Sequence, residues 1–192
     1  VALLRAAGDA VVRRAPVEAA RWYRAATDLL PEHPTPGAGE LWAALGGALG
    51  AAGDLGGARS ALVRALDLLP ADAMADRVAL VSNCARIEHA LGHHDAAHRR
   101  LTTALDRTGD GYPAESVSLM SAITLDHLYR LEYRVAVDWA QRACAAADRL
   151  GDPHLRAEAA TSLALSAALA GAEPEAEAAC TTAAALVDAL PD

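Results

Sequence analysis

The chain has 192 residues, a formal net charge of −8 and a hydrophobic content of 53%, with few aromatic residues and no Phe. This hydrophobic content excludes an intrinsically disordered chain. The acidic balance argues against direct nucleic-acid contact by this segment, because phosphate contacts require a basic face.

Ala and Leu dominate over Val, Ile and Thr, which favours helices over strands. Pro16 and Pro174 fit the first turn of a helix, and Gly53, Gly92 and Gly171 mark tight turns between helices. In chain order, the pattern predicts ten helices over residues 2–14, 16–30, 38–52, 55–69, 72–91, 94–107, 113–130, 133–149, 153–170 and 174–190.

The uncharged stretches 41–53 and 159–172 are shorter than the roughly 20 residues that span a bilayer. No signal peptide is visible. Cys84, Cys144 and Cys180 form no C-x-x-C pair, which fits a reducing compartment. We therefore expect a cytoplasmic protein without a membrane partner. Cys84 and Cys180 fall at predicted core positions, so we expect buried, inert thiols.

A repeat of about 39 residues organises the chain. Four residues recur with spacings of 4, 3 and 5, and the first Ala advances by 39, 39, 39 and 40 residues. The copies are Ala19-Tyr23-Ala26-Pro31, Ala58-Leu62-Ala65-Pro70, Ala97-Leu101-Ala104-Gly109, Ala136-Ala140-Ala143-Asp148 and the looser Ala176-Cys180-Ala183-Asp188. Regular self-similarity of this length is typical of solenoids.

The second copy resembles a tetratricopeptide repeat (TPR). The residues that carry the resemblance are Trp42, Leu45, Gly46, Leu49, Ala58, Leu62, Ala65 and Pro70. In this pattern small residues let the two helices of a hairpin approach, bulky residues fill the space between hairpins, and Pro ends the second helix. The resemblance implies an all-α, right-handed α-solenoid of about five TPR-like hairpins. We expect one domain over residues 1–192, which is a fragment of a larger multidomain protein.

In such solenoids the first helix of each hairpin lines a concave groove. The resemblance places eight candidate groove residues there: Ser82, Arg86, His89, Ser121, Leu125, Tyr129, Glu158 and Thr161. One interpretation is a binding site for a peptide, a protein partner or a small-molecule effector. The other is a packing surface for flanking repeats or domains. Self-association into a homo-oligomer is a separate expectation.

No catalytic motif is present, so we expect no enzyme activity and no cofactor. His89, His93, His94 and His98 cluster around one predicted turn, and His94 and His98 have a spacing that can hold a metal. Because the sequence fixes no further ligands and turn histidines are usually solvated, we predict no metal site.

A narrower resemblance comes from the amino-acid sequence of several segments. Residues 3–31, "ALGHHDAAHRRL" from Ala90 and "LVDALPD" at the end look like the helical arm of the large ATP-binding, LuxR-family bacterial transcription regulators. That resemblance implies a non-catalytic arm that senses an effector and assembles the regulator in signal transduction. The alternative is a free-standing TPR scaffold that binds a peptide or protein in its groove.

Overall fold

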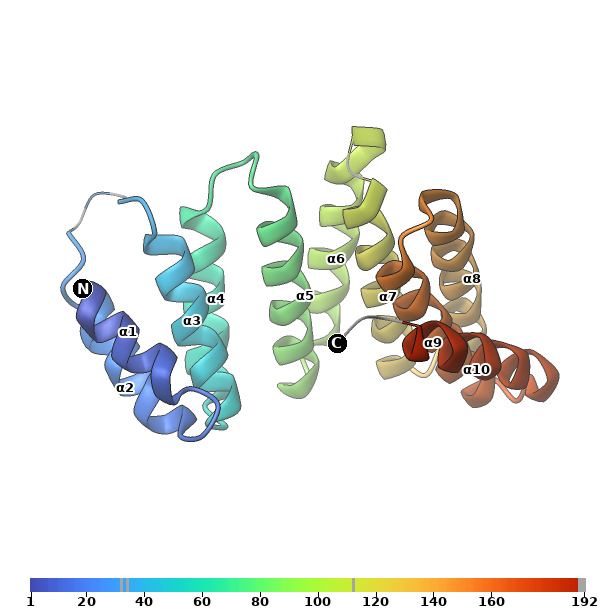
Figure 1. The fold of residues 1–192 in the computed structure, drawn as a ribbon, viewed down its shortest axis with the longest axis horizontal. Coiled ribbons are helices and arrows are strands. Elements are labelled where there is room, and N and C mark those ends of the chain that lie inside the picture. The colour runs from blue at the N-terminus through green and yellow to red at the C-terminus, as the bar shows by residue number, and fades with distance from the viewer. Residues whose placement is uncertain (32, 34, 112, 190–192) are drawn as a thin grey trace. The chain divides into compact units, whose positions relative to one another are not determined.

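The computed structural model describes residues 1–31, 33, 35–111 and 113–189. All regular structure in these residues is helical, and consecutive helices within each part of the chain run in alternating directions (Figure 1). The helices are α1 (Ala2–Val11), α2 (Pro16–Thr27), α3 (Ala38–Ala51), α4 (Leu55–Leu68), α5 (Met74–Ala90), α6 (His94–Thr108), α7 (Pro113–Tyr129), α8 (Tyr133–Leu150), α9 (Pro153–Leu169) and α10 (Glu173–Asp188), with a short 3₁₀ turn, η1 (Gly109–Gly111). The predicted all-α class and the ten predicted helices are confirmed for the described residues.

Most helix ends lie within two residues of the predicted positions. The largest differences are at α1, which ends at Val11 instead of residue 14, and at α2, which ends at Thr27 instead of residue 30. Ala15 precedes Pro16 and adopts φ −141°, because a residue before proline is disfavoured in the helical region. Leu190, the predicted end of the last helix, lies outside the described residues. None of the helices described is long and apolar enough to cross a membrane.

The chain divides into two compact units, Val1–His93 and His94–Asp192. The first contains α1 to α5 and the second contains α6 to α10. Within each unit, every helix packs on the next one along the chain, and in the second unit α7 also contacts α9. This is the packing order of a helical-repeat array. The expectation of a single domain over the whole chain stays a prediction.

The core of the first unit is built around the TPR-like signature. Leu45, Ala58, Leu62 and Ala65 are buried, and Trp42 packs against the same cluster. A Cβ atom added at Gly46 would lie 2.7 Å from the Leu62 Cγ and 3.3 Å from the Ala58 carbonyl oxygen. Gly46 therefore allows α3 and α4 to approach closely, as predicted. Pro70 lies two residues after the end of α4, just past the capping residue Leu69, where a proline prevents the helix from continuing.

The core of the second unit is formed largely by small residues. Ala143, Ala147 and Ala159 pack with Val117, and Ala167 and Ala176 pack with Val137. The expected buried thiol at Cys84 is found in the first unit, but Cys180 is exposed and the expectation for it is wrong. Among the described helices α10 packs mainly on α9, which leaves part of its surface, including Cys180, exposed.

Four helix–helix turns share one geometry. Gly53, Gly92 and Gly171 have φ between 74° and 86°. In each turn the N–H of the residue after the glycine donates a hydrogen bond to the carbonyl five residues earlier, in the last turn of the preceding helix. These bonds satisfy carbonyl groups that a helix end otherwise leaves open. The fourth turn, between α7 and α8, has the same bonds but places Leu131 at the left-handed position, with φ 61°. Leucine is rarely found there, so this turn carries backbone strain.

Candidate functional site

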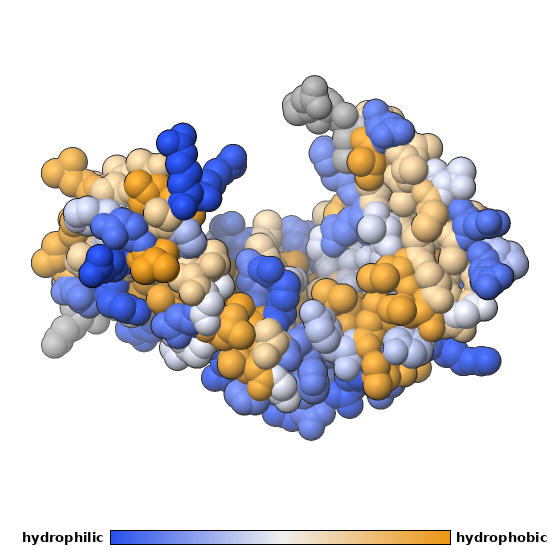
Figure 2. All heavy atoms as spheres, turned by 90° about the horizontal axis from the view of Figure 1, so that it is seen from below, coloured by the Kyte–Doolittle hydropathy of each residue, from blue (hydrophilic) through white to orange (hydrophobic). Residues whose placement is uncertain are grey.

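An exposed apolar surface lies on two helices of the second unit. Leu125 and Tyr129 on α7, and Leu165 and Leu169 on α9, are 38%, 46%, 48% and 48% exposed. The members of each pair are four residues apart, so they lie on one side of their helix, and the two helices contact each other. We call these four residues the α7/α9 face. In the right half of Figure 2, where the second unit is drawn, hydrophobic side chains gather in patches between hydrophilic ones.

The corresponding surface of the first unit has a different character. In the 39-residue register, Leu125 and Tyr129 correspond to Gly47 and Ala51 on α3, and to Arg86 and Ala90 on α5. All four of those residues are exposed, but none presents a large apolar side chain. Large exposed apolar side chains at this repeat position therefore occur on α7 and α9.

Four of the eight predicted groove residues belong to this surface or its edge. Leu125 and Tyr129 are part of the α7/α9 face itself. Glu158 and Thr161 are exposed on α9, and the Thr161 hydroxyl donates to the Ala157 carbonyl. Partial desolvation by neighbouring atoms raises the pKa of the Glu158 carboxyl above its usual range.

The other predicted groove residues have different environments. Ser121 on α7 and His89 on α5 are buried, so both contribute to packing between helices. Ser82 is half-buried, and Arg86 is exposed and donates to the Asn83 side chain over 2.7 Å. Arg86 and His89 lie in the first unit, so we describe them apart from the α7/α9 face.

A depression adjoins the α7/α9 face at the turns that end α7 and α9. Its volume is about 380 Å³, and Leu169 lines both it and the face. The other lining residues are Leu131, Glu132, Tyr133, Arg134, Val135 and Ala170. Leu131 is 71% exposed, so the strained turn presents an apolar side chain beside this depression.

Charge is distributed unevenly between the two units. Residues 94–192 contain 15 acidic residues and 8 Arg, whereas residues 1–93 contain 10 acidic residues and 9 Arg. The second unit therefore carries nearly all of the net negative charge.

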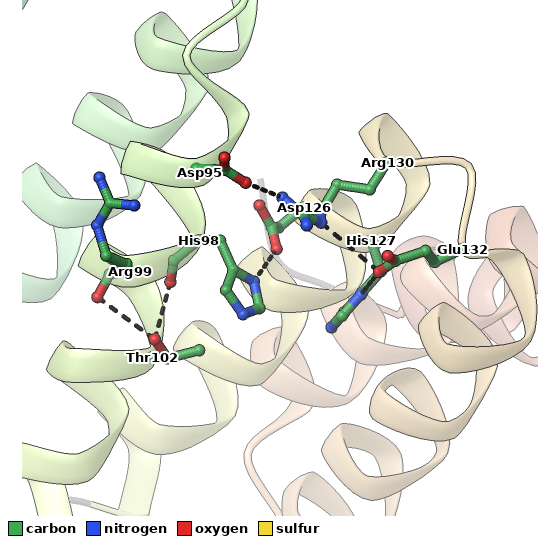
Figure 3. Close-up of polar contacts among 8 residues, drawn as sticks. All are labelled: Asp95, His98, Arg99, Thr102, Asp126, His127, Arg130 and Glu132. Atoms are coloured by element: carbon green, nitrogen blue, oxygen red, sulfur yellow. Dashed lines mark hydrogen bonds and ion pairs between the residues drawn. The ribbon is translucent and has the colours of Figure 1, made fainter.

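A polar cluster connects α6 to α7 inside the second unit (Figure 3). The His98 Nδ1 lies 2.6 Å from the Asp126 carboxylate, and the His127 Nδ1 lies 2.6 Å from the Glu132 carboxylate. The two imidazole rings meet edge to face with centroids 5.6 Å apart. Asp126 is completely buried and His127 is 8% exposed. We call His98, Asp126, His127 and Glu132 the His98 cluster.

An ion pair borders the His98 cluster on its solvent side. Arg130 donates to Asp95 over 2.9 Å and also approaches Glu132. The hydrogen bond from Arg130 lowers the pKa of the Asp95 carboxyl, and the hydrogen bond with His127 lowers the pKa of the Glu132 carboxyl. Both carboxyl groups are therefore ionised at neutral pH.

Sequence reasoning considered His94 and His98 as a pair, but the structure separates their roles. His94 stacks on Tyr129, with ring centroids 6.4 Å apart, whereas His98 faces Asp126. Asp126 and His127 were missed as partners of His98 because they lie 28 and 29 residues further along the chain. The 39-residue register offers a signal: Arg59 corresponds to His98 and Glu88 to His127, and Arg59 pairs with Glu88 over 3.0 Å.

Together, the antiparallel helices, the repeated turns and the signature around Gly46 define a TPR-like helical-repeat protein. Solved structures agree with this class. A Podosopora anserina protein described as a kinesin light chain with nearly identical TPR-like repeats has a TM-score of 0.77 at 15% identity, with 95% of this chain and 92% of that chain covered. No protein-family model and no curated protein matches the sequence.

Two further structures show the same fold. A Rap protein complexed with competence and sporulation factor has a TM-score of 0.76 at 15% identity, and the match covers 96% of this chain but 53% of the Rap chain. BtubC from P. vanneervenii has a TM-score of 0.71 at 19% identity, with 94% of this chain and 78% of that chain covered. At these identities the similarity concerns the fold.

Proposed function

We propose that the protein is a TPR-like scaffold whose α7/α9 face binds a peptide segment of a protein partner. The observation that carries the proposal is the set of four exposed apolar side chains at equivalent positions of two adjacent repeats. Clustered exposed apolar residues on a folded protein mark interaction sites more often than isolated ones do. Spacings of four residues on parallel faces suit apolar anchors of a bound helix or strand.

The chemistry of the partner follows from the surface. Each of the four side chains is about half exposed, so covering it contributes about 1 kcal/mol. Part of this gain is offset by the ordering of the peptide, so apolar contacts alone give weak binding. The acidic second unit favours a peptide in which apolar anchors are flanked by Lys or Arg.

The fold similarity is consistent with this proposal. The Rap structure described above contains a bound factor, and it shares the fold of this chain over 96% of its length. Scaffolds of stacked hairpins offer extended surfaces that suit peptide recognition. Under this proposal the protein acts by binding and has no catalytic role.

The test is selection of binding peptides from a random library, followed by affinity measurements with variants. We expect selected peptides to carry apolar anchors and basic flanks, and to lose at least 10-fold in affinity when Leu165 and Leu169 are both replaced by Ser. Val187→Ser is the control, because Val187 is a 53% exposed apolar residue on α10 that does not belong to the α7/α9 face. Equal affinity for all three proteins would contradict the surface assignment, and failure to select any peptide would contradict the function.

A finer form of the proposal is that the scaffold is the sensor arm of a LuxR-family regulator. It is supported by the resemblance of residues 3–31 and of the segment from Ala90 to the helical arm of those regulators. Arg86, an exposed cation on α5, would then contact the effector, and Arg86→Ala should abolish the response. Reading the coding sequence on both sides of this segment provides the first check, since a phosphate-binding loop upstream and a helix-turn-helix downstream are required.

A further inference from the structure

The contact between α6 and α7 differs in chemistry from the equivalent contacts in other repeats. The repeat register gives the residues equivalent to His98 and His127 in the other contacts. They are Ala20 and Leu49 between α2 and α3, and Val137 and Ala167 between α8 and α9. Those four residues are buried and apolar. The equivalent contact between α4 and α5 contains the ion pair of Arg59 and Glu88.

A buried polar group destabilises a fold unless it is well paired, so packing alone favours apolar residues at this position. The apolar contacts show that the same helix geometry forms without them. The α6–α7 contact nevertheless contains two imidazoles and a carboxylate. One ligand atom from each of His98, Asp126 and His127 lies within 4.8 Å of the others.

This combination of side chains is the usual ligand set of a transition metal. Zn²⁺ binds imidazole nitrogen and carboxylate oxygen at about 2.0–2.2 Å, with ligand atoms about 3.3 Å apart in a tetrahedral site. The His98 Nδ1 and the Asp126 oxygen, now 2.6 Å apart, would have to separate slightly, and the other ligand-atom distances, which are at most 4.8 Å, would adjust toward the same spacing. Side-chain rotation can supply shifts of about 1 Å. His98 is the ligand from α6, and Asp126 and His127 come from α7.

Glu132 orients one of the ligands. Its carboxylate lies 2.6 Å from the His127 Nδ1, which holds the proton on that nitrogen and leaves the lone pair on Nε2. Metal-binding histidines commonly have such a carboxylate partner on the second nitrogen. The strained turn at Leu131 brings Glu132 to this place, since the Glu132 N–H also donates to the His127 carbonyl over 2.9 Å.

The site also has access to solvent. The side chain of His98 is 35% exposed, while that of Asp126 is fully buried. An ion can thus reach the ligands from the His98 side and keep a water molecule as its fourth ligand, as open zinc sites do.

We propose that His98, Asp126 and His127 bind a divalent transition-metal ion of the Zn²⁺ type, with Glu132 as a positioning residue for His127. The bound ion would link α6 to α7. This inference is independent of the peptide-binding proposal, because it concerns a different set of side chains.

The test is calorimetric titration of the intact protein with Zn²⁺ at about pH 7.5. Cys180 is exposed and can bind zinc by itself, so all proteins carry Cys180→Ser. We expect one Zn²⁺ per chain, a loss of at least 100-fold in affinity for His98→Gln and for His127→Gln, and a loss of about 10-fold for Glu132→Gln. His154→Gln is the matched control, since His154 is an exposed histidine of the same unit.

A second measurement tests the site without substituting any of the proposed metal ligands. Imidazole NMR signals of the protein with His98 and His127 intact should shift on addition of Zn²⁺, while the His154 signal stays in place. The proposal is overturned if the folded protein takes up no Zn²⁺, if His98→Gln and His127→Gln bind as tightly as their parent, or if Zn²⁺ shifts other histidines only.

Discussion

Leu131 adopts the left-handed backbone conformation that Gly92 adopts 39 residues earlier, with φ 61° and 77° respectively. The flanking hydrogen bonds are the same, since Glu132 donates to the His127 carbonyl as His93 donates to the Glu88 carbonyl. The packing of the repeat thus imposes the same turn at both positions, and Leu131 adopts an unfavourable backbone conformation to form it.

Replacing Leu131 by Gly should therefore stabilise the protein. A residue with a Cβ atom pays about 1 kcal/mol in this conformation, and Leu131 is 71% exposed, so little packing is lost. We expect the free energy of unfolding in urea to rise by about 1 kcal/mol. The reverse change, Gly92→Leu, should lower it by a similar amount. A less stable Leu131→Gly protein would show that the Leu131 side chain contributes more than its strain costs.

Two neighbouring glycines of α3 should respond oppositely to the same substitution. At Gly46 a new Cβ atom would lie 2.7 Å from the Leu62 Cγ, whereas at Gly47 it would meet no atom within 4 Å. We expect Gly46→Ala to destabilise the protein by about 1–3 kcal/mol through overpacking. Gly47→Ala should stabilise it by about 0.5–1 kcal/mol through helix propensity. Urea unfolding followed by circular dichroism measures both, and equal effects would argue against close packing at Gly46.

Arg59 pairs with the fully buried Glu88, so replacing only one of these two residues should lower the stability of the protein. Arg59→Met leaves the buried carboxylate without this cation and should destabilise the protein by about 3 kcal/mol. The double variant Arg59→Met/Glu88→Leu should recover most of the loss, because other repeats have apolar residues here, such as Ala20 with Leu49. A double-mutant cycle measures the coupling, and additive losses would contradict this account.

Tyr23 should make the protein sensitive to alkaline pH. Burial and the hydrogen bond to Asp9 raise the pKa of the Tyr23 phenol to about 12. Because this pKa is above the value in the unfolded chain, the neutral phenol stabilises the fold below about pH 10. That contribution is lost as pH rises toward 12. In Tyr23→Phe the ionisation step near pH 12 should disappear from an ultraviolet titration, and the loss of stability above pH 10 should be smaller. An unchanged titration would show that another tyrosine accounts for that step.

The sequence was sufficient for the fold because its signals are local. Pro16 and Pro174 are found in the first turns of α2 and α10, and Gly53, Gly92 and Gly171 make the predicted turns. These residues act through their own backbone preferences. Leu131 gave no such signal, because the conformation there is imposed by the rest of the repeat.

Side-chain environments were harder to predict because they depend on neighbouring helices. His89 and Ser121 occupy expected groove positions but are buried, and Cys180 occupies an expected core position but is exposed. The helical period places a residue on a side of its helix, whereas its burial depends on what packs there. The His98 cluster requires the same knowledge, since its members come from α6, from α7 and from the turn after α7.

The polar contacts between hairpins also bear on how this gene can evolve. In a repeat array each hairpin contacts only its neighbours, so removal of one whole unit preserves the fold when all the contacts between hairpins are interchangeable. Here, deletion of residues 21–59 would place Ala20 opposite Glu88 and bury a carboxylate without the cation that now pairs with it. Such a deletion would lower the stability of the protein, so the Arg59–Glu88 contact favours keeping the hairpins in their present number and order.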